Sequence, residues 1–236
     1  MPNETKLLAV LIDADNTSPQ WAEAIFEEIA SLGEASVRRI YGDFSSNYLK
    51  GWAEKLATLA LVPHQQFANT IGKNSSDIAL VIDAMDILHT GRFDGFVLIS
   101  SDSDFTRLAS RIREQGVDVY GIGQQKTPAA FRNACKRFIY VENLISDAVP
   151  ADKTAAKPVK RSKPEDARSL VLRAFDALDD EEWVSLGRLG QQITTANPDF
   201  DPRNYGKQKL SDLIQSLKMV ELRQGENNQL QVRRLD

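Results

Sequence analysis

Aspartates recur in this 236-residue sequence where short apolar runs end, and this placement suits chemistry on phosphates. Like charges held together repel and raise each other's pKa, so a cluster of carboxylates is stable mainly around a cation. Two His residues and one Cys leave almost no material for a zinc site, so the sequence favours Mg²⁺ or Mn²⁺ with oxygen ligands. Such a cation is suited to phosphoryl transfer. The acids concerned are Asp13, Asp15, Asp43, Asp77, Asp102 and Asp104.

The elements that must position these acids alternate between strand and helix patterns. Strand-like segments, the first of them a continuous apolar run, are predicted at 7–12, 37–41, 61–67, 96–100, 117–122 and 138–141. Helix patterns between them cover 18–32, 49–59, 75–88, 105–114 and 128–134. This alternation predicts a parallel sheet covered by helices on both faces, with the carboxyl ends of its strands at one edge. Asp77 begins a helix at that same edge, so at least four carboxylates should converge there.

Each acid also has a plainer explanation. Asp and Asn after strands commonly cap helices or form turns, and Asp104 alone could cap a helix beginning at Phe105. Asp83 lies among apolar residues, where a carboxylate must be paired or hydrogen-bonded, so either a structural or a supporting role is open to it. Supporting or undecided roles are assigned likewise to Asp15, Asp43 and Ser100.

Composition and charge narrow the class of protein. At 42% hydrophobic and 26% charged residues, the composition is that of a globular protein with a core of its own. The longest apolar run, 7–12, is too short to span a membrane, and the single Cys favours a reducing, cytoplasmic setting. A pI of about 5.4 counts mildly against tight nonspecific binding to nucleic acid.

The charge is unevenly distributed and marks a domain boundary. Residues 1–149 hold 14 basic and 19 acidic side chains, whereas 150–164 hold five basic and one acidic together with three prolines. We predict that 150–164 is an extended basic linker between a first domain at 1–149 and a second at 165–236. In the second domain, helix patterns at 167–178, 185–193 and 205–217 precede strands at 220–223 and 230–233. Three helices and a hairpin predict a winged helix, a fold that commonly binds nucleic acid and sometimes protein.

The first acidic motif is shared by two families. Asp13-Ala14-Asp15-Asn16-Thr17 matches the D-x-D-x-T pattern of haloacid-dehalogenase-like phosphatases, in which Asp13 would be the nucleophile and Asp15 the acid/base. The rest of the sequence fits that family less well, because the segment before Asp102 lacks the usual glycine and Asp77 has no role. A phosphatase is therefore the alternative enzyme.

A wider resemblance covers most of residues 6–145. The sequence resembles an NYN domain, a branch of the PIN-like nucleases with a three-layer α/β/α fold, in the segments 12–16, 72–78, 82–85, 100–108 and 126–131. Residues 204–213 and 220–222 are similar to an OST-HTH (LOTUS) domain. This resemblance implies a metal-dependent endoribonuclease, in which metal-activated water cleaves RNA, joined to a module that binds RNA or a partner protein. A non-catalytic RNA-binding adaptor is the alternative outside the enzymes.

The resemblance also implies roles for individual residues. Asp13, Asp77 and Asp102 would hold Mg²⁺ or Mn²⁺, and Asp104 and Asn16 would complete or orient the site. Tyr205 would stack on a base, although it equally suits a core or capping position. Candidate RNA contacts are Lys73, Arg107, Lys126 and Arg132 in the first domain, and Arg203, Tyr205, Lys207 and Lys209 in the second.

Overall fold

Two compact units divide the chain between Ala151 and Asp152. The computed structural model describes residues 5–67, 75–145, 161–178, 182–225 and 228–235. Residues 150–160 of the predicted linker 150–164 lie outside the described residues, and residues 161–164 are described. No helix in the described ranges is long and apolar enough to cross a membrane.

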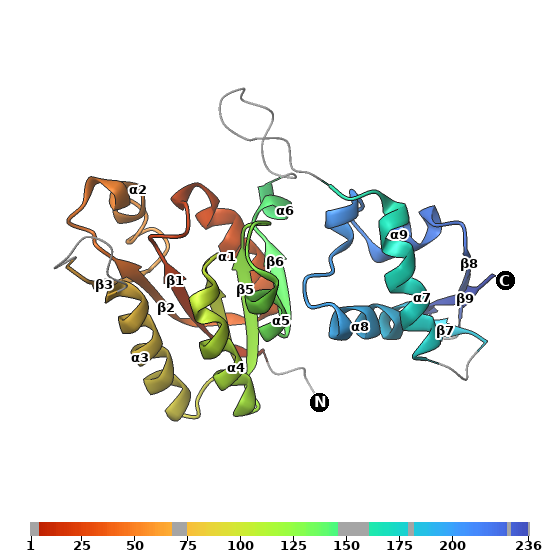
Figure 1. The fold of residues 1–236 in the computed structure, drawn as a ribbon, viewed down its shortest axis with the longest axis horizontal. Coiled ribbons are helices and arrows are strands. Elements are labelled where there is room, and N and C mark those ends of the chain that lie inside the picture. Colours follow the sequence, from red (N-terminus) through yellow and green to blue (C-terminus); the bar gives the residue numbers. More distant parts are fainter. Residues whose placement is uncertain (1–4, 68–74, 146–160, 179–181, 226–227, 236) are drawn as a thin grey trace, which may run out of the picture. The chain divides into compact units, whose positions relative to one another are not determined.

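A six-stranded parallel sheet forms the centre of the first unit (Figure 1). Its strand order is β3-β2-β1-β4-β5-β6, and every neighbouring pair is parallel. The carboxyl ends of β1 and β4 are neighbours, because Ile12 pairs with Ile99. The bounds are β1 Leu7–Asp13, β2 Glu34–Gly42, β3 Val62–Gln65, β4 Gly95–Ile99, β5 Asp118–Gly123 and β6 Arg137–Tyr140.

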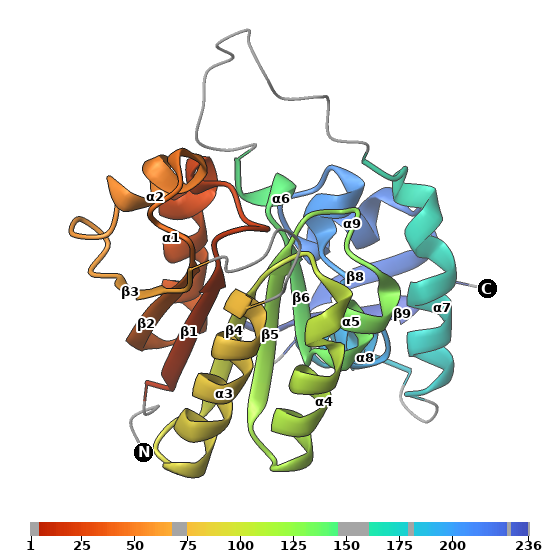
Figure 2. The ribbon, with the colours of Figure 1, turned by 60° about the vertical axis from the view of Figure 1, so that its left-hand side comes forward.

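Helices cover both faces of this sheet, which confirms the predicted three-layer fold (Figure 2). One face carries α1 Ala22–Leu32, α2 Lys50–Ala53 and α6 Glu142–Ile145. The other carries α3 Ser75–His89, α4 Thr106–Glu114 and α5 Ala129–Ala134. Short 3₁₀ turns precede three of these helices: η1 Pro19–Trp21, η2 Asn47–Leu49 and η3 Ser103–Phe105.

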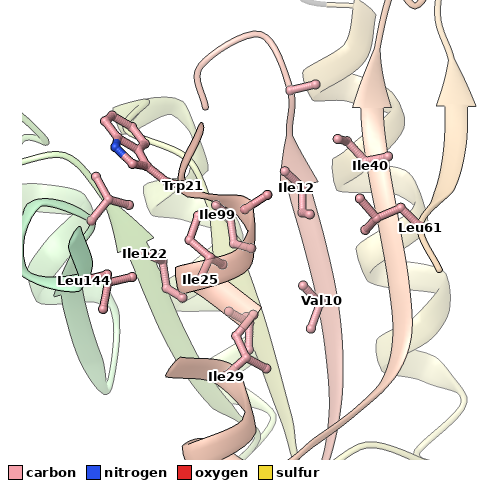
Figure 3. Close-up of a cluster of buried hydrophobic side chains, with 14 of the residues drawn as sticks. Val10, Ile12, Trp21, Ile25, Ile29, Ile40, Leu61, Ile99, Ile122 and Leu144 are labelled. Atoms are coloured by element: carbon pink, nitrogen blue, oxygen red, sulfur yellow. The ribbon is translucent and has the colours of Figure 1, made fainter. Parts of the chain in front are cut away.

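Alternation along the strands explains why the sheet has two cores. On β1, Leu8, Val10 and Ile12 belong to the cluster beneath α1, whereas Ala9 and Leu11 belong to the cluster beneath α3 and α4. All five side chains are fully buried. A strand buried on both faces needs a continuous apolar run, and 7–12 supplies it. Figure 3 shows the α1 side, where Ile25 and Ile29 pack against Val10 and Ile12.

The predicted helix 49–59 is wrong in length. Regular helix ends at Ala53, and the residues up to 60 form turns. Tertiary packing overrides a sequence of good helix formers here: Leu56 and Leu59 pack on the core, and Leu61 is buried just before β3. Ala60, at φ 52°, turns the chain into that strand.

The second unit is a helical domain with a three-stranded antiparallel sheet, which confirms the winged helix. The sheet order is β7-β9-β8, and the two-residue strand β7 was not predicted. The predicted helix 205–217 begins too early, because Gly206 adopts a left-handed conformation (φ 71°) that separates a 3₁₀ turn from α9. The bounds are η4 Pro164–Ala167, α7 Arg168–Asp176, β7 Val184–Ser185, α8 Leu186–Ala196, η5 Pro202–Tyr205, α9 Leu210–Ser216, β8 Val220–Gln224 and β9 Leu230–Arg234.

Candidate active site

Asp13 is a buried carboxylate at the carboxyl end of the central strand β1. Its side chain is the last of the strand, and the residue is only 1% exposed. Its Oδ2 accepts hydrogen bonds from Ser100 Oγ (2.6 Å) and Asn16 Nδ2 (2.9 Å), and its Oδ1 accepts from the backbone N–H groups of Asp15 and Asn16 (3.2 Å each). Burial raises the pKa of Asp13, and the bonds from Ser100 and Asn16 oppose that rise. The carboxylate is therefore held in one orientation.

Ser100 connects Asp13 to the second acidic segment. Its hydroxyl donates to Asp13 and accepts from the backbone N–H of Asp102 (3.0 Å). Asp102 Oδ1 in turn accepts from the backbone N–H of Asp104 (2.9 Å), so Asp102 is the N-cap of η3. The suggestion that Asp104 provides the cap is thereby corrected, because the turn begins two residues earlier than the predicted helix. Asp104 itself is exposed.

Asp77 shows that the carboxylates share one edge of the sheet. It lies in the first turn of α3, and the Oγ of the neighbouring Ser76 donates to Asp15 Oδ2 (3.0 Å). The pKa of Asp77 is raised to about 6, first by burial and then by surrounding negative charges. Those charges belong to Asp13, Asp102, Asp15 and Asp104, in decreasing order. We call these five aspartates, which come from β1, α3 and the turn after β4, the carboxylate rim.

The donor chemistry of the rim fits a hard divalent cation. Its ligands are all oxygens, and the raised pKa of Asp77 reports negative charge that a cation would offset. Among the described residues, no group of three Asp, Glu, His or Cys side chains stands in a geometry ready to hold a metal ion. The fit therefore rests on the kind and charge of the donors, and not on a preformed coordination shell.

Two further acids belong to separate hydrogen-bonded groups. Asp43 follows β2, where its Oδ1 accepts from Gln65 Nε2 (2.7 Å) and from Ser45. Asp83, on α3, accepts hydrogen bonds from Arg39 and Tyr41. Burial alone would raise the pKa of Asp83, but the bonds from these two partners outweigh it and lower the pKa overall.

The predicted RNA-contacting cations of the first unit differ in their surroundings. Arg107 is exposed in the first turn of α4, and Lys126 is exposed in the loop after β5, so both elements begin or end at the edge that carries the rim. Arg132 is half-buried and donates to the Tyr140 hydroxyl (2.5 Å). Lys73 lies outside the described residues.

In the second unit, the predicted contacts fall on and beside η5. Arg203 forms a two-point ion pair with Asp201, with Nε–Oδ1 and Nη2–Oδ2 distances of 3.0 and 2.8 Å. Tyr205 is half-buried, with its ring 5.8 Å from that of Phe200, which places it against the core. Lys209 is exposed at the N-terminus of α9, and Lys207 is partly exposed.

Sequence reasoning missed the residues that hold the first acidic loop. The Thr17 side chain is buried, with its Oγ1 3.3 Å from the carbonyl oxygen of Ile99. Trp52 is also buried, and its Nε1 donates to the Thr17 carbonyl oxygen (2.8 Å). Thr17 could have been found as the last residue of the acidic motif, but the sequence carries no signal that pairs it with Trp52.

The parallel sheet and its carboxylate rim define a PIN-like α/β domain, and comparison with protein families gives the same class. Residues 7–144 match the NYN domain family, so the chain belongs to the NYN family. Residues 159–232 match the OST-HTH/LOTUS domain. Both resemblances inferred from the sequence motifs are thereby confirmed.

Two solved structures resemble parts of the chain. A crystal structure of a protein of unknown function from Vibrio parahaemolyticus aligns at 18% identity over 59% of this chain and 95% of that one, with a TM-score of 0.49. A solution structure of an uncharacterized protein from Nitrosomonas europaea aligns at 31% identity over 38% of this chain and 89% of that one, with a TM-score of 0.27. No curated protein sequence matches the chain.

Proposed function

We propose that this protein is a metal-dependent endoribonuclease whose active site is the carboxylate rim. The observation that carries the proposal is the convergence of aspartates from separate elements at one edge of the sheet: Ser100 bonds both Asp13 and the backbone of Asp102, and Ser76, beside Asp77, bonds Asp15. A fold gains nothing in stability from gathering five carboxylates, and a divalent cation offsets their repulsion. Membership of the NYN family, which is a family of nuclease-like domains, supports the same function.

Asp13, Asp77 and Asp102 are the proposed ligands of Mg²⁺ or Mn²⁺, with Asp104 beside them. When bound, the cation supplies Lewis acidity at the scissile phosphate and lowers the pKa of a water molecule. Asn16 and Ser100 orient the Asp13 carboxylate, since each donates to its Oδ2. Asp15, held by Ser76, supports the electrostatics of the rim.

The cations around the rim are proposed to bind the RNA backbone. Arg107 and Lys126 are exposed on elements that start or end at the rim, which suits contacts to phosphates on either side of the cleaved bond. The OST-HTH domain is proposed to bind RNA through Lys207 and Lys209. A tethered second binding site raises the local concentration of substrate at the rim.

The family match argues against the phosphatase alternative. Residues 7–144 match the NYN domain family, in which the acids of the rim are expected to hold a cation. The phosphatase reading also leaves Asp77 without a role.

Cleavage of labelled single-stranded RNA tests the proposal. The full chain is incubated with Mn²⁺ or Mg²⁺, with EDTA as the metal-free arm. We expect internal cleavage that requires metal and falls by about a hundredfold or more in the Asp13→Asn/Asp102→Asn double variant. Asp86→Asn is the matched control, because Asp86 is exposed on α3 outside the rim.

The possible results separate the enzyme from its alternatives. Equal cleavage by the wild type and the double variant would assign the activity to a contaminant. RNA binding without cleavage would assign the chain to non-catalytic RNA-binding adaptors. Hydrolysis of a phosphomonoester that depends on Asp13 alone would restore the phosphatase.

A further inference from the structure

A pocket of about 500 Å³ lies between the end of β3 and helix α3, outside the carboxylate rim. It adjoins the rim along the same helix, because Ile78 in its wall follows Asp77 directly. We call it the α3 pocket. Its lining residues are His64, Gln66, Ser75, Ile78, Ala79, Ile82 and Asp83.

One wall of the α3 pocket is apolar and exposed. Ile78 and Ile82 are 61% and 58% exposed, although most large apolar side chains of the first unit are buried. They stand four residues apart and therefore lie on the same face of α3. The residues Leu80, Ala84 and Ile87 pack on the sheet from another face of the helix. Exposed isoleucines beside fixed polar groups are typical of a ligand site.

The polar side of the pocket is held rigidly. Asp83 accepts hydrogen bonds from Arg39 and Tyr41, and the His64 ring lies against the Tyr41 ring with their centroids 4.9 Å apart. The Nδ1 of His64 is 3.8 Å from Asp83 Oδ2. A carboxylate fixed in this way accepts hydrogen bonds from a ligand and donates none.

We propose that the α3 pocket binds one unpaired nucleobase that carries an exocyclic amino group, from the RNA strand bound at the rim. This inference rests on the proposed nuclease function and adds base selectivity to it. Ile78 and Ile82 contact the face of the base, and Asp83 and Gln66 hydrogen-bond its edge.

The choice of an amino-bearing base follows from the acceptor character of Asp83. Cytosine presents an N4 amino donor where uracil presents the O4 acceptor, and a carboxylate accepts from the first and repels the second. A base in this pocket lies next to the strand segment at Asp77, because one helix carries both sites.

Paired 12-nucleotide strands of oligocytidylate and oligouridylate test the inference. Their dissociation constants for the full chain are measured by fluorescence anisotropy with Ca²⁺ in place of Mg²⁺, and gels verify that the strands stay intact. We expect oligocytidylate to bind about fivefold tighter or more, the value of one hydrogen bond. Asp83→Asn should reduce that ratio towards one.

Ile82→Ala tests the pocket independently of the Arg39–Asp83 pair. An exposed isoleucine replaced by a better helix former leaves the fold intact. We expect binding of oligocytidylate to weaken about threefold or more. The matched control is Leu7→Ala, an exposed apolar residue at the opposite, amino-terminal end of β1, which should leave the affinity unchanged.

Three results would overturn the inference: equal affinity of the wild type for the two strands, a ratio unchanged in a folded Asp83→Asn variant, or an Ile82→Ala variant that binds as the Leu7→Ala control does.

Because binding is measured without cleavage, the nuclease proposal and the base-site proposal can fail separately. Base selectivity that depends on Asp83, together with no cleavage in Mn²⁺, would contradict the proposed nuclease activity and support the proposed base site in the α3 pocket. Cleavage without such selectivity would contradict the pocket alone.

Discussion

Ionised Asp77 destabilises the folded protein when no metal ion is bound, because it is half-buried among other carboxylates. Its pKa is raised from 3.8 to about 6, so the folded state disfavours the ionised form. A carboxyl group with a raised folded pKa lowers stability above that pKa, and stability returns as the pH falls through about 6 towards 4. We expect Asp77→Asn to stabilise the metal-free protein at pH 7 by about 1–2 kcal/mol, after allowing for solvent screening of this half-buried group.

Thermal unfolding in EDTA at pH 7 and pH 5 measures this effect. The gain should be largest at pH 7 and about half as large at pH 5, where the carboxyl group is mostly protonated in the folded protein but still mostly ionised in the unfolded chain. Asp86→Asn on the same helix is the control and should give little change at either pH. A gain that is equal at the two pH values, or equal in the control, would contradict an electrostatic origin.

At the scale of residues, the positions of the acidic side chains could be predicted from the sequence better than the residues that hydrogen-bond to them. Asp13, Asp77 and Asp102 could be placed at one edge because their order relative to the strands is visible in the sequence. The bond between Ser100 and Asp13 joins residues 87 apart, and the pairing of Asp83 with Arg39 joins residues 44 apart. Contacts of this kind depend on strand order and register, which the local pattern does not contain.

At the scale of elements, two glycines of the second unit have opposite energetic roles. Gly206 connects η5 to α9 at φ 71°, where a side chain is strained, whereas Gly187 sits in α8 with nothing within 4 Å of an added Cβ. We expect Gly206→Ala to destabilise the domain by about 1 kcal/mol. Gly187→Ala should stabilise it by about 0.5 kcal/mol. Denaturant unfolding of both variants measures the difference, and a shift of the same sign in both would contradict the assignment.

The elements themselves were predictable where the hydrophobic period was long and regular. All six predicted strands of the parallel sheet are present, and β1 and β4, which are buried on both faces, contain the continuous apolar runs that such strands need. The two predicted helices with wrong bounds, 49–59 and 205–217, contain good helix formers, but regular helix ends at Ala53 in the first and begins only after Gly206 in the second. Packing of Leu56 and Leu59 on the core decides the first of these turns, and helix propensity carries no information about that packing.

At the scale of the whole molecule, the two units have separate hydrophobic cores and separate sheets. We therefore expect the NYN unit to fold and cleave without residues 152–236. For long RNA, the KM should rise about tenfold or more, because the truncated chain no longer holds the substrate near the rim through a second binding site. The kcat should stay within about twofold, because the rim itself is unchanged. Steady-state kinetics on long and short RNA check this.

Replacement of the exposed cations in the full chain provides the companion experiment. Lys207→Ala/Lys209→Ala should raise the KM in the same direction as the truncation, with an unchanged kcat. A truncated chain with an unchanged KM would show that the OST-HTH domain does not deliver RNA to the rim, and would favour a protein partner for it.

The strand order also determines when the rim can assemble during synthesis on the ribosome. Strand β1 is made before both of its neighbours in the sheet, of which β2 follows soon after and β4 comes much later. Until Gly95–Ile99 and Ser100 have left the exit tunnel, Asp13 lacks its hydroxyl donor and one side of β1 has no partner strand. The nascent chain thus carries an open edge on an apolar strand while the residues between β1 and β4 are being made, which is the stage at which a chaperone would bind it.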